Sequence, residues 1–271
     1  MKTRVIAGLS MVVGMMGIGL AAPKWVAAIM WTAVVAIATY ELLHNTELVK
    51  EPRLIAYAVG AAVACGVWSY FGASFPWGLL GLVVFMALLF LEMMRHHVEI
   101  TFQKITMTFM AGVAIPVMMC SIIRILTMSI GRYMVLVPFI AAVLNDTGGY
   151  FAGMFFGRHK LAPVISPKKT IEGAVGGVLL AMLGMALYAA ILDLLFDFNV
   201  NYGFAMIYGL LGALFGMFGD LCFSVIKRQS GIKDYGNLIP GHGGALDRFD
   251  SMLLVGPLVE ALLILIPVAV G

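Results

Sequence analysis

Long apolar runs separated by short polar connectors dominate the sequence. An α-helix needs about 20 consecutive apolar residues to cross a hydrocarbon core of roughly 30 Å, and such runs recur along the 271 residues. The pattern predicts an all-α polytopic integral membrane protein. Its nine predicted spans lie near residues 5–22, 25–43, 54–71, 77–94, 105–127, 133–156, 171–192, 203–226 and 249–270.

Basic residues alternate with these connectors, as the positive-inside rule requires. Fourteen of the 17 Lys and Arg residues fall on one side of the predicted membrane. This distribution predicts a cytoplasmic N-terminus in the inner (cytoplasmic) membrane of the cell. The two richest cytoplasmic loops, 157–170 and 227–248, hold eight of these bases. The first apolar run is also compatible with a secretory signal peptide; we favour a span, because the rest of the chain is itself embedded.

Composition supports the membrane class, since 62% of residues are hydrophobic and only 11% are charged. A soluble domain would carry about twice that charge. Cys65, Cys120 and Cys222 each lie alone in an apolar run. We interpret them as packing residues and expect neither a zinc site nor a disulfide.

Polar residues within the membrane concentrate in the C-terminal half. We therefore predict an N-terminal scaffold or dimer surface over residues 1–130, with about five helices. Residues 131–271 are the predicted catalytic part, with about four helices and cytoplasmic catalytic loops.

Charged residues at membrane depth are costly and usually functional. Asp146 interrupts an apolar span, and it belongs either to a polar site or to a hydrogen bond with a neighbouring helix. Asp220, Ser224 and Lys227 recur at i, i+4 and i+7, so they share one helix face. This spacing favours a metal or substrate role for Asp220; the alternative is a structural ion pair with Lys227 or Arg228.

The loop after this span is rich in charge and glycine. Asp247 and Asp250 would share one face of a starting helix, where the backbone dipole favours carboxylates, so one of them could serve only as a cap. Glycines in this loop allow bare amides to approach phosphate oxygens. With the neighbouring bases they predict an anion pocket, although clustered bases can also attract anionic lipid head groups. The bases are Lys227, Arg228, Lys233 and Arg248, and the glycines include Gly243 and Gly244; His242, Asp247 and Asp250 lie in the same stretch.

The upstream loop contains Ser166-Pro-Lys168-Lys169-Thr170-Ile-Glu172. Ser166 as N-cap and Pro167 at the first helical position predict a helix whose amide end faces whatever the two lysines attract. A capped helix preceded by bases is also an ordinary topology signal.

Acids that hold divalent cations, beside bases and amides that hold phosphates, indicate phosphoryl or nucleotidyl transfer to a lipid. In such reactions positioning and charge neutralisation supply most of the catalysis.

The residues also match a known pattern. Ser224-Val-Ile-Lys227-Arg228, Lys233-Asp234 and the run from Pro240 to Asp250 together resemble the 27-residue signature of phosphatidate cytidylyltransferases, also called CDP-diacylglycerol synthases. The segment from Ser166 to Gly173 and the Asn145-Asp146 pair resemble further family segments, so the likeness covers about residues 140–260.

The resemblance implies that CTP and phosphatidate react to CDP-diacylglycerol and pyrophosphate, with magnesium (Mg2+) required and a second cation left open. It also implies a homodimer in the lipid bilayer and no nucleic-acid partner. Carried over by position, Asp220, Asp247 and Asp250 are metal ligands, with Asp234 nearby. Lys227, Arg228, Lys233 and Arg248 neutralise phosphates, and His242, Gly243 and Gly244 shape the nucleotide turn. The expected substrate-binding positions are Asp146, Ser166, Lys168, Lys169, Thr170, Glu172, Ser224, Gly243 and Gly244.

Two other functions compete with this prediction. A CTP-dependent kinase of a membrane alcohol such as dolichol or phytol would move the γ-phosphate instead of the cytidylyl group. A transporter would carry polar residues along several spans and broken-helix repeats in both halves, whereas here they crowd into one half.

Overall fold

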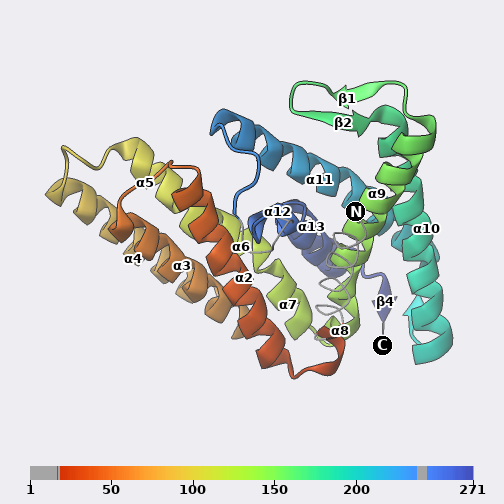
Figure 1. Ribbon diagram of the computed structural model, residues 1–271. Coiled ribbons are helices and arrows are strands. Elements are labelled where there is room, and N and C mark those ends of the chain that lie inside the picture. Colours follow the sequence, from red (N-terminus) through yellow and green to blue (C-terminus); the bar gives the residue numbers. More distant parts are fainter. Residues whose placement is uncertain (1–16, 18, 237–242, 271) are drawn as a thin grey trace. The chain divides into compact units, whose positions relative to one another are not determined.

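A computed structural model describes residues 17, 19–236 and 243–270 of the chain (Figure 1). In this part of the chain, seven helices are long and apolar enough to cross a membrane. The chain divides into two packing units, residues 1–127 with 229–249 and residues 128–228 with 250–271. The predicted division into a scaffold and a catalytic part concerns function, and it stays a prediction.

The first unit is a helical bundle with a broken helix inside it. Three long helices are followed by a run of short ones, and a single turn from the distant segment 229–249 completes the unit. Its elements are α2 (Lys24–Asn45), α3 (Pro52–Tyr70), α4 (Phe75–Arg95), α5 (Phe102–Phe109), η1 (Met110–Ala114), α6 (Ile115–Met119), α7 (Ser121–Thr127) and α12 (Leu246–Phe249).

The break between α5 and α7 has a local cause. Pro116 offers no backbone N–H, and the preceding turn η1 is a π-helix, so the ladder of hydrogen bonds is interrupted. Side chains of α2 donate to two of the carbonyls in this stretch. Thr39 Oγ1 donates to Ala111 O at 3.1 Å, and Trp31 Nε1 donates to Met119 O at 2.8 Å. These bonds fix the broken helix against α2.

The second unit contains long apolar helices and two small antiparallel strand pairs. Glycines allow α9 and α10 to run side by side (Figure 1): a Cβ on Gly177 would lie 2.6 Å from Asn145 O. The elements are α8 (Gly131–Met134), α9 (Leu136–Phe156), β1 (Lys160–Ala162), β2 (Ser166–Thr170), α10 (Ile171–Phe196), β3 (Asn199–Val200), α11 (Tyr202–Gln229), α13 (Met252–Leu265) and β4 (Ala269–Val270). Strand β1 pairs with β2, and β3 pairs with β4.

The predicted all-α membrane class is confirmed, and the seven predicted spans between residues 25 and 226 all correspond to membrane-length helices. The total of nine is not confirmed. The predicted span 5–22 lies mostly outside the described residues. In place of the span 249–270, α13 has 14 residues, or about 21 Å of helix against a core of roughly 30 Å. It ends next to Pro267, because the residue before a proline disfavours the helical conformation.

The prediction that Ser166 caps a helix beginning at Pro167 is wrong. Residues Ser166–Thr170 form strand β2, and α10 begins at Ile171. Thr170 is the N-cap, and its Oγ1 accepts the Gly173 N–H at 3.1 Å. The cap position therefore lies four residues later, because Ser166 pairs across the hairpin with Ala162.

Candidate active site

One face of α11 carries the polar side chains that the i, i+4, i+7 spacing predicts. The helix is continuous over Tyr202–Gln229, so Asp220, Ser224 and Lys227 follow one another toward its C-terminal end. Ser224 Oγ donates to Asp220 Oδ1 at 3.4 Å. A carboxylate, a hydroxyl and an ammonium group therefore line one face of a membrane-spanning helix.

The β1–β2 hairpin brings a second cation to this face. Lys169 forms an ion pair with Asp220. The hairpin joins α9 to α10 in the same unit and is fixed at its base by Glu172. The Glu172 carboxylate accepts the amides of Arg158 and His159 at 3.1 and 3.2 Å, and its Oε1 lies 2.6 Å from His159 Nδ1. These contacts hold residues 158 and 159, which precede β1, against the start of α10.

Asp250 lies in the turn before α13, outside the seven spans, and is 8% exposed. Its Oδ2 is 4.0 Å from Lys227 Nζ, and its Oδ1 accepts the Ser251 N–H at 2.8 Å. Burial raises the pKa of Asp250 well above its usual range; the charges of Asp220 and Asp146 raise this pKa further, while Lys227 opposes them. The negative charges of Asp220 and Asp146 thus disfavour the ionised form of Asp250, and a cation bound beside Asp250 would offset them.

The acids of this cluster fit magnesium. Mg2+ is commonly held by one or two carboxylates together with substrate phosphates and water, rather than by a cage made entirely of protein. Asp220 and Asp250 can supply these carboxylates. Over residues 17, 19–236 and 243–270, the structure contains no group of three or more His, Cys, Asp or Glu side chains placed to bind one metal ion.

Asp247 belongs to the first unit and stabilises the turn that carries it. Its Oδ2 accepts two backbone N–H groups, from Tyr235 at 2.7 Å and from Gly244 at 3.0 Å. Gly243 has a φ of +84°, and a Cβ there would lie 2.8 Å from Asp247 Oδ2. Asp247 therefore holds the turn that precedes α12. Its two predicted roles, helix cap and metal ligand, both stay predictions. The Gly244 amide is engaged by Asp247.

Glu41 is a buried acid next to the turn 244–247 that the sequence analysis does not single out. It lies in α2, is 4% exposed, and its two carboxylate oxygens accept the amides of Ala245 and Leu246 at 3.1 and 3.0 Å. A signal was present, because an acid inside the predicted span 25–43 is as unusual as Asp146 in its own span. The polar pattern of the sequence instead predicts a scaffold or dimer surface for that half of the chain.

The remaining predicted residues have less defined surroundings. The side chain of Thr170 caps α10, and Ser166 and Lys168 lie in β2. The side chains of Arg228, Lys233, Asp234 and Arg248 are exposed, whereas His242 lies outside the described residues. The roles of these residues stay predictions.

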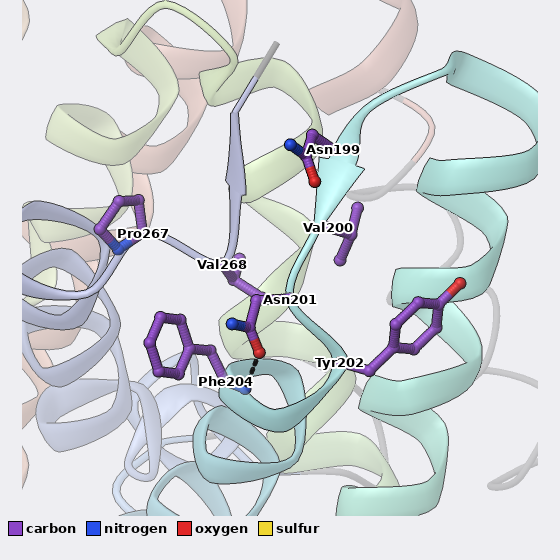
Figure 2. A pocket seen from close by; sticks show the side chains of 7 residues that line it. All are labelled: Asn199, Val200, Asn201, Tyr202, Phe204, Pro267 and Val268. Atoms are coloured by element: carbon purple, nitrogen blue, oxygen red, sulfur yellow. Dashed lines mark hydrogen bonds between the residues drawn. The ribbon is translucent and has the colours of Figure 1, made fainter.

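A cavity of about 410 Å³ lies at the other end of α11, far from Asp220. Asn201 begins that helix there, and its side chain accepts the Phe204 N–H at 3.0 Å (Figure 2). Asp220 follows Tyr202 by 18 residues, or about 27 Å along the helix. This cavity is therefore not part of the acid and lysine cluster.

Fold and site define a multi-pass membrane protein with carboxylates and lysines gathered toward one end of its α11 helix. The chain belongs to the cytidylyltransferase family, whose sequence profile matches residues 2–266.

Curated relatives share its sequence over a shorter stretch. A "phosphatidate cytidylyltransferase" of Staphylococcus haemolyticus (strain JCSC1435) is 45% identical over 139 residues, which is 51% of this chain and 52% of the relative. The protein of the same name from Staphylococcus aureus (strain COL) is 46% identical over 141 residues, with the same coverage of both chains. The matched segment thus spans about half the length of these relatives.

Proposed function

We propose that this protein is a phosphatidate cytidylyltransferase. A phosphate oxygen of phosphatidate attacks the α-phosphorus of CTP in line; a new P–O–P bond forms, and the bond from the α-phosphorus to the oxygen bridging it to the β-phosphorus breaks. The products are CDP-diacylglycerol and pyrophosphate. The family match over nearly the whole chain is the observation that carries the proposal, and the name of the relatives supports its choice of substrates.

The cluster of acids and lysines supports this chemistry. Asp220 and Asp250, with Asp247 as the resemblance implies, would hold magnesium, which supplies charge neutralisation on the phosphates when bound. Lys169 and Lys227 already pair with two of these acids. When CTP arrives, its phosphates would compete for the same ammonium groups.

No general base is needed in this proposal. The attacking phosphate oxygen is ionised at neutral pH, so the work of the site is to hold two polyanions together. Arg228, Lys233 and Arg248 would add positive charge around the triphosphate or the phosphatidate head. His242 would orient a phosphate as a hydrogen-bond donor.

The setting of the reaction is part of the proposal. Phosphatidate reaches the site from the lipid bilayer, and CTP and pyrophosphate are exchanged on the cytoplasmic side of the inner membrane. The excess of Lys and Arg in loops 157–170 and 227–248 supports this orientation. The active form would be a homodimer.

The test is an assay of the purified protein with phosphatidate and CTP, with and without magnesium. CTP is labelled on the cytosine in one arm and on the γ-phosphate in the other. We expect cytosine label in the lipid fraction, γ-phosphate label in pyrophosphate, and no reaction without magnesium. Label from the γ-phosphate in the lipid would instead show a kinase, and unlabelled lipid in both arms would refute nucleotidyl transfer.

A further inference from the structure

Helix α2 supports the segment 229–249 at three points along its length, all within the first unit. Trp31 contacts Phe249 edge to face, with ring centroids 5.1 Å apart. Glu41 accepts two amides at the start of α12, and the side-chain amide of Asn45 donates to the carbonyl of Tyr235. These three side chains recur on one side of α2, and their partners flank Asp247 along the chain.

Glu41 makes the central contact. Its two oxygens accept the successive amides of Ala245 and Leu246, whose residues are 3% and 1% exposed. The preceding amide, that of Gly244, donates to Asp247. Three consecutive amides are thus held by two carboxylates, and the geometry of the turn depends on both.

Two glycines allow Glu41 to come this close. A Cβ on Gly236 would lie 2.4 Å from Glu41 Oε1, and a Cβ on Gly244 would lie 2.3 Å from Glu41 Oε2. Any side chain at either position would displace the carboxylate from its amides. These two glycines, which both precede Asp247 in the chain, therefore serve the approach of Glu41, in addition to any freedom they give the loop.

Glu92, a second buried acid in the same unit, contacts other side chains and serves as a comparison for Glu41. Glu92 is 6% exposed, and its Oε1 lies 3.3 Å from Arg53 Nη1 and 3.7 Å from His96 Nε2. Glu92 thus joins α3 to α4. Glu41 differs because its bonds end on the backbone of the turn that presents Asp247.

We propose that Glu41 is a positioning residue for the active site: it fixes the turn 244–247 and thereby the place of the Asp247 carboxylate. The effect of Glu41 on catalysis rests on the proposed function. The contact between Glu41 and the turn is observed and does not depend on it. It gives the N-terminal half a role in catalysis that the interpretation as a scaffold or dimer surface lacks. Glu41 contacts no substrate and acts through the turn.

The experiment compares Glu41→Gln with Glu92→Gln in the full-length protein in detergent. A glutamine at position 41 can accept one amide, but its NH2 group faces the other donor. We measure hydrogen exchange in peptides covering 243–249 and α3, the midpoint of thermal unfolding, and kcat/KM for CTP. For Glu41→Gln we expect at least about 10-fold faster exchange at Ala245 and Leu246, unchanged exchange in α3, an unchanged midpoint and a comparable loss of kcat/KM.

Glu92→Gln should leave exchange at 243–249 as in the parent protein. The proposal is overturned by any of three results for Glu41→Gln: unchanged exchange at the turn, equal loss of protection in α3, or local loss with the parent kcat/KM. If the parent protein does not convert CTP and phosphatidate, the proposed function fails, while the exchange experiment still decides whether Glu41 holds the turn.

Discussion

Substitution of Gly244 by alanine tests whether the contact between Glu41 of α2 and the turn requires a residue without a side chain at position 244. The new Cβ would lie within 2.3 to 2.5 Å of three atoms of the Glu41 carboxyl group. The carboxylate is the end of a flexible side chain and can move, but moving breaks its bonds to Ala245 and Leu246. Hydrogen bonds to charged groups contribute about 1.5–3 kcal/mol each, so losing both costs about 3–6 kcal/mol.

The assay is the free energy of local opening at the amides of Ala245 and Leu246, obtained from hydrogen exchange. Gly244→Ala should lower it by about 3–6 kcal/mol, up to the stability of the unit. Gly60→Ala is the matched control, because a Cβ on Gly60 in α3 meets nothing within 4 Å. That change should be neutral or stabilise the helix by up to about 1 kcal/mol.

A double-mutant cycle with Glu41→Ala completes the test. Once the carboxylate is gone, Gly244→Ala has nothing to displace, so the two changes together should cost little more than Glu41→Ala alone. Additive costs would mean that Gly244 is required for another reason, and the explanation by close approach would be refuted.

Three further predictions concern the reaction. Asp247→Ala should abolish CDP-diacylglycerol formation in membranes at saturating magnesium, and near-normal turnover would refute its role as a metal ligand. Lys169→Ala removes an ion-pair partner of Asp220. It should raise KM for CTP by about 10-fold or more, because one charge-assisted contact to phosphate is lost. The control is Lys168→Ala: the side chain of Lys168 is exposed, and its loss should change KM by less than about threefold. Removal of divalent cations with a chelator should stop turnover, and added magnesium should restore it; turnover that persists would refute the metal-assisted mechanism.

Hydropathy predicted the spans well because a membrane helix must satisfy its backbone internally, which ties its length to the bilayer. Helical spacing likewise predicted the common face of Asp220 and Lys227. The sequence could not show that Ser166 pairs across a hairpin, since a Ser-Pro start has the same local chemistry in a strand and at a helix cap. Pairing of Lys169 with Asp220 depends on how the hairpin folds onto α11, which no local pattern contains.

The Glu41 contact was harder to predict for a different reason. An acid near the end of an apolar run looks like the boundary of a span, and only the position of the amides 245 and 246 distinguishes a buried acceptor from a solvated one. Asp247 had two interpretations in the sequence, a helix cap or a metal ligand. Its carboxylate accepts the amides of Tyr235 and Gly244, which precede α12, so both interpretations stay predictions.

The separation of Glu41 from its partners also has a consequence for biosynthesis. Ala245 follows Glu41 by 204 residues, and at about 5–20 residues per second the ribosome needs roughly 10–40 s to make that stretch. Throughout this interval α2 carries its acid without the two amides that accommodate it in the finished fold. A nascent chain that stops before the turn cannot complete the first unit, and its Glu41 carboxylate lacks both of these hydrogen-bond donors.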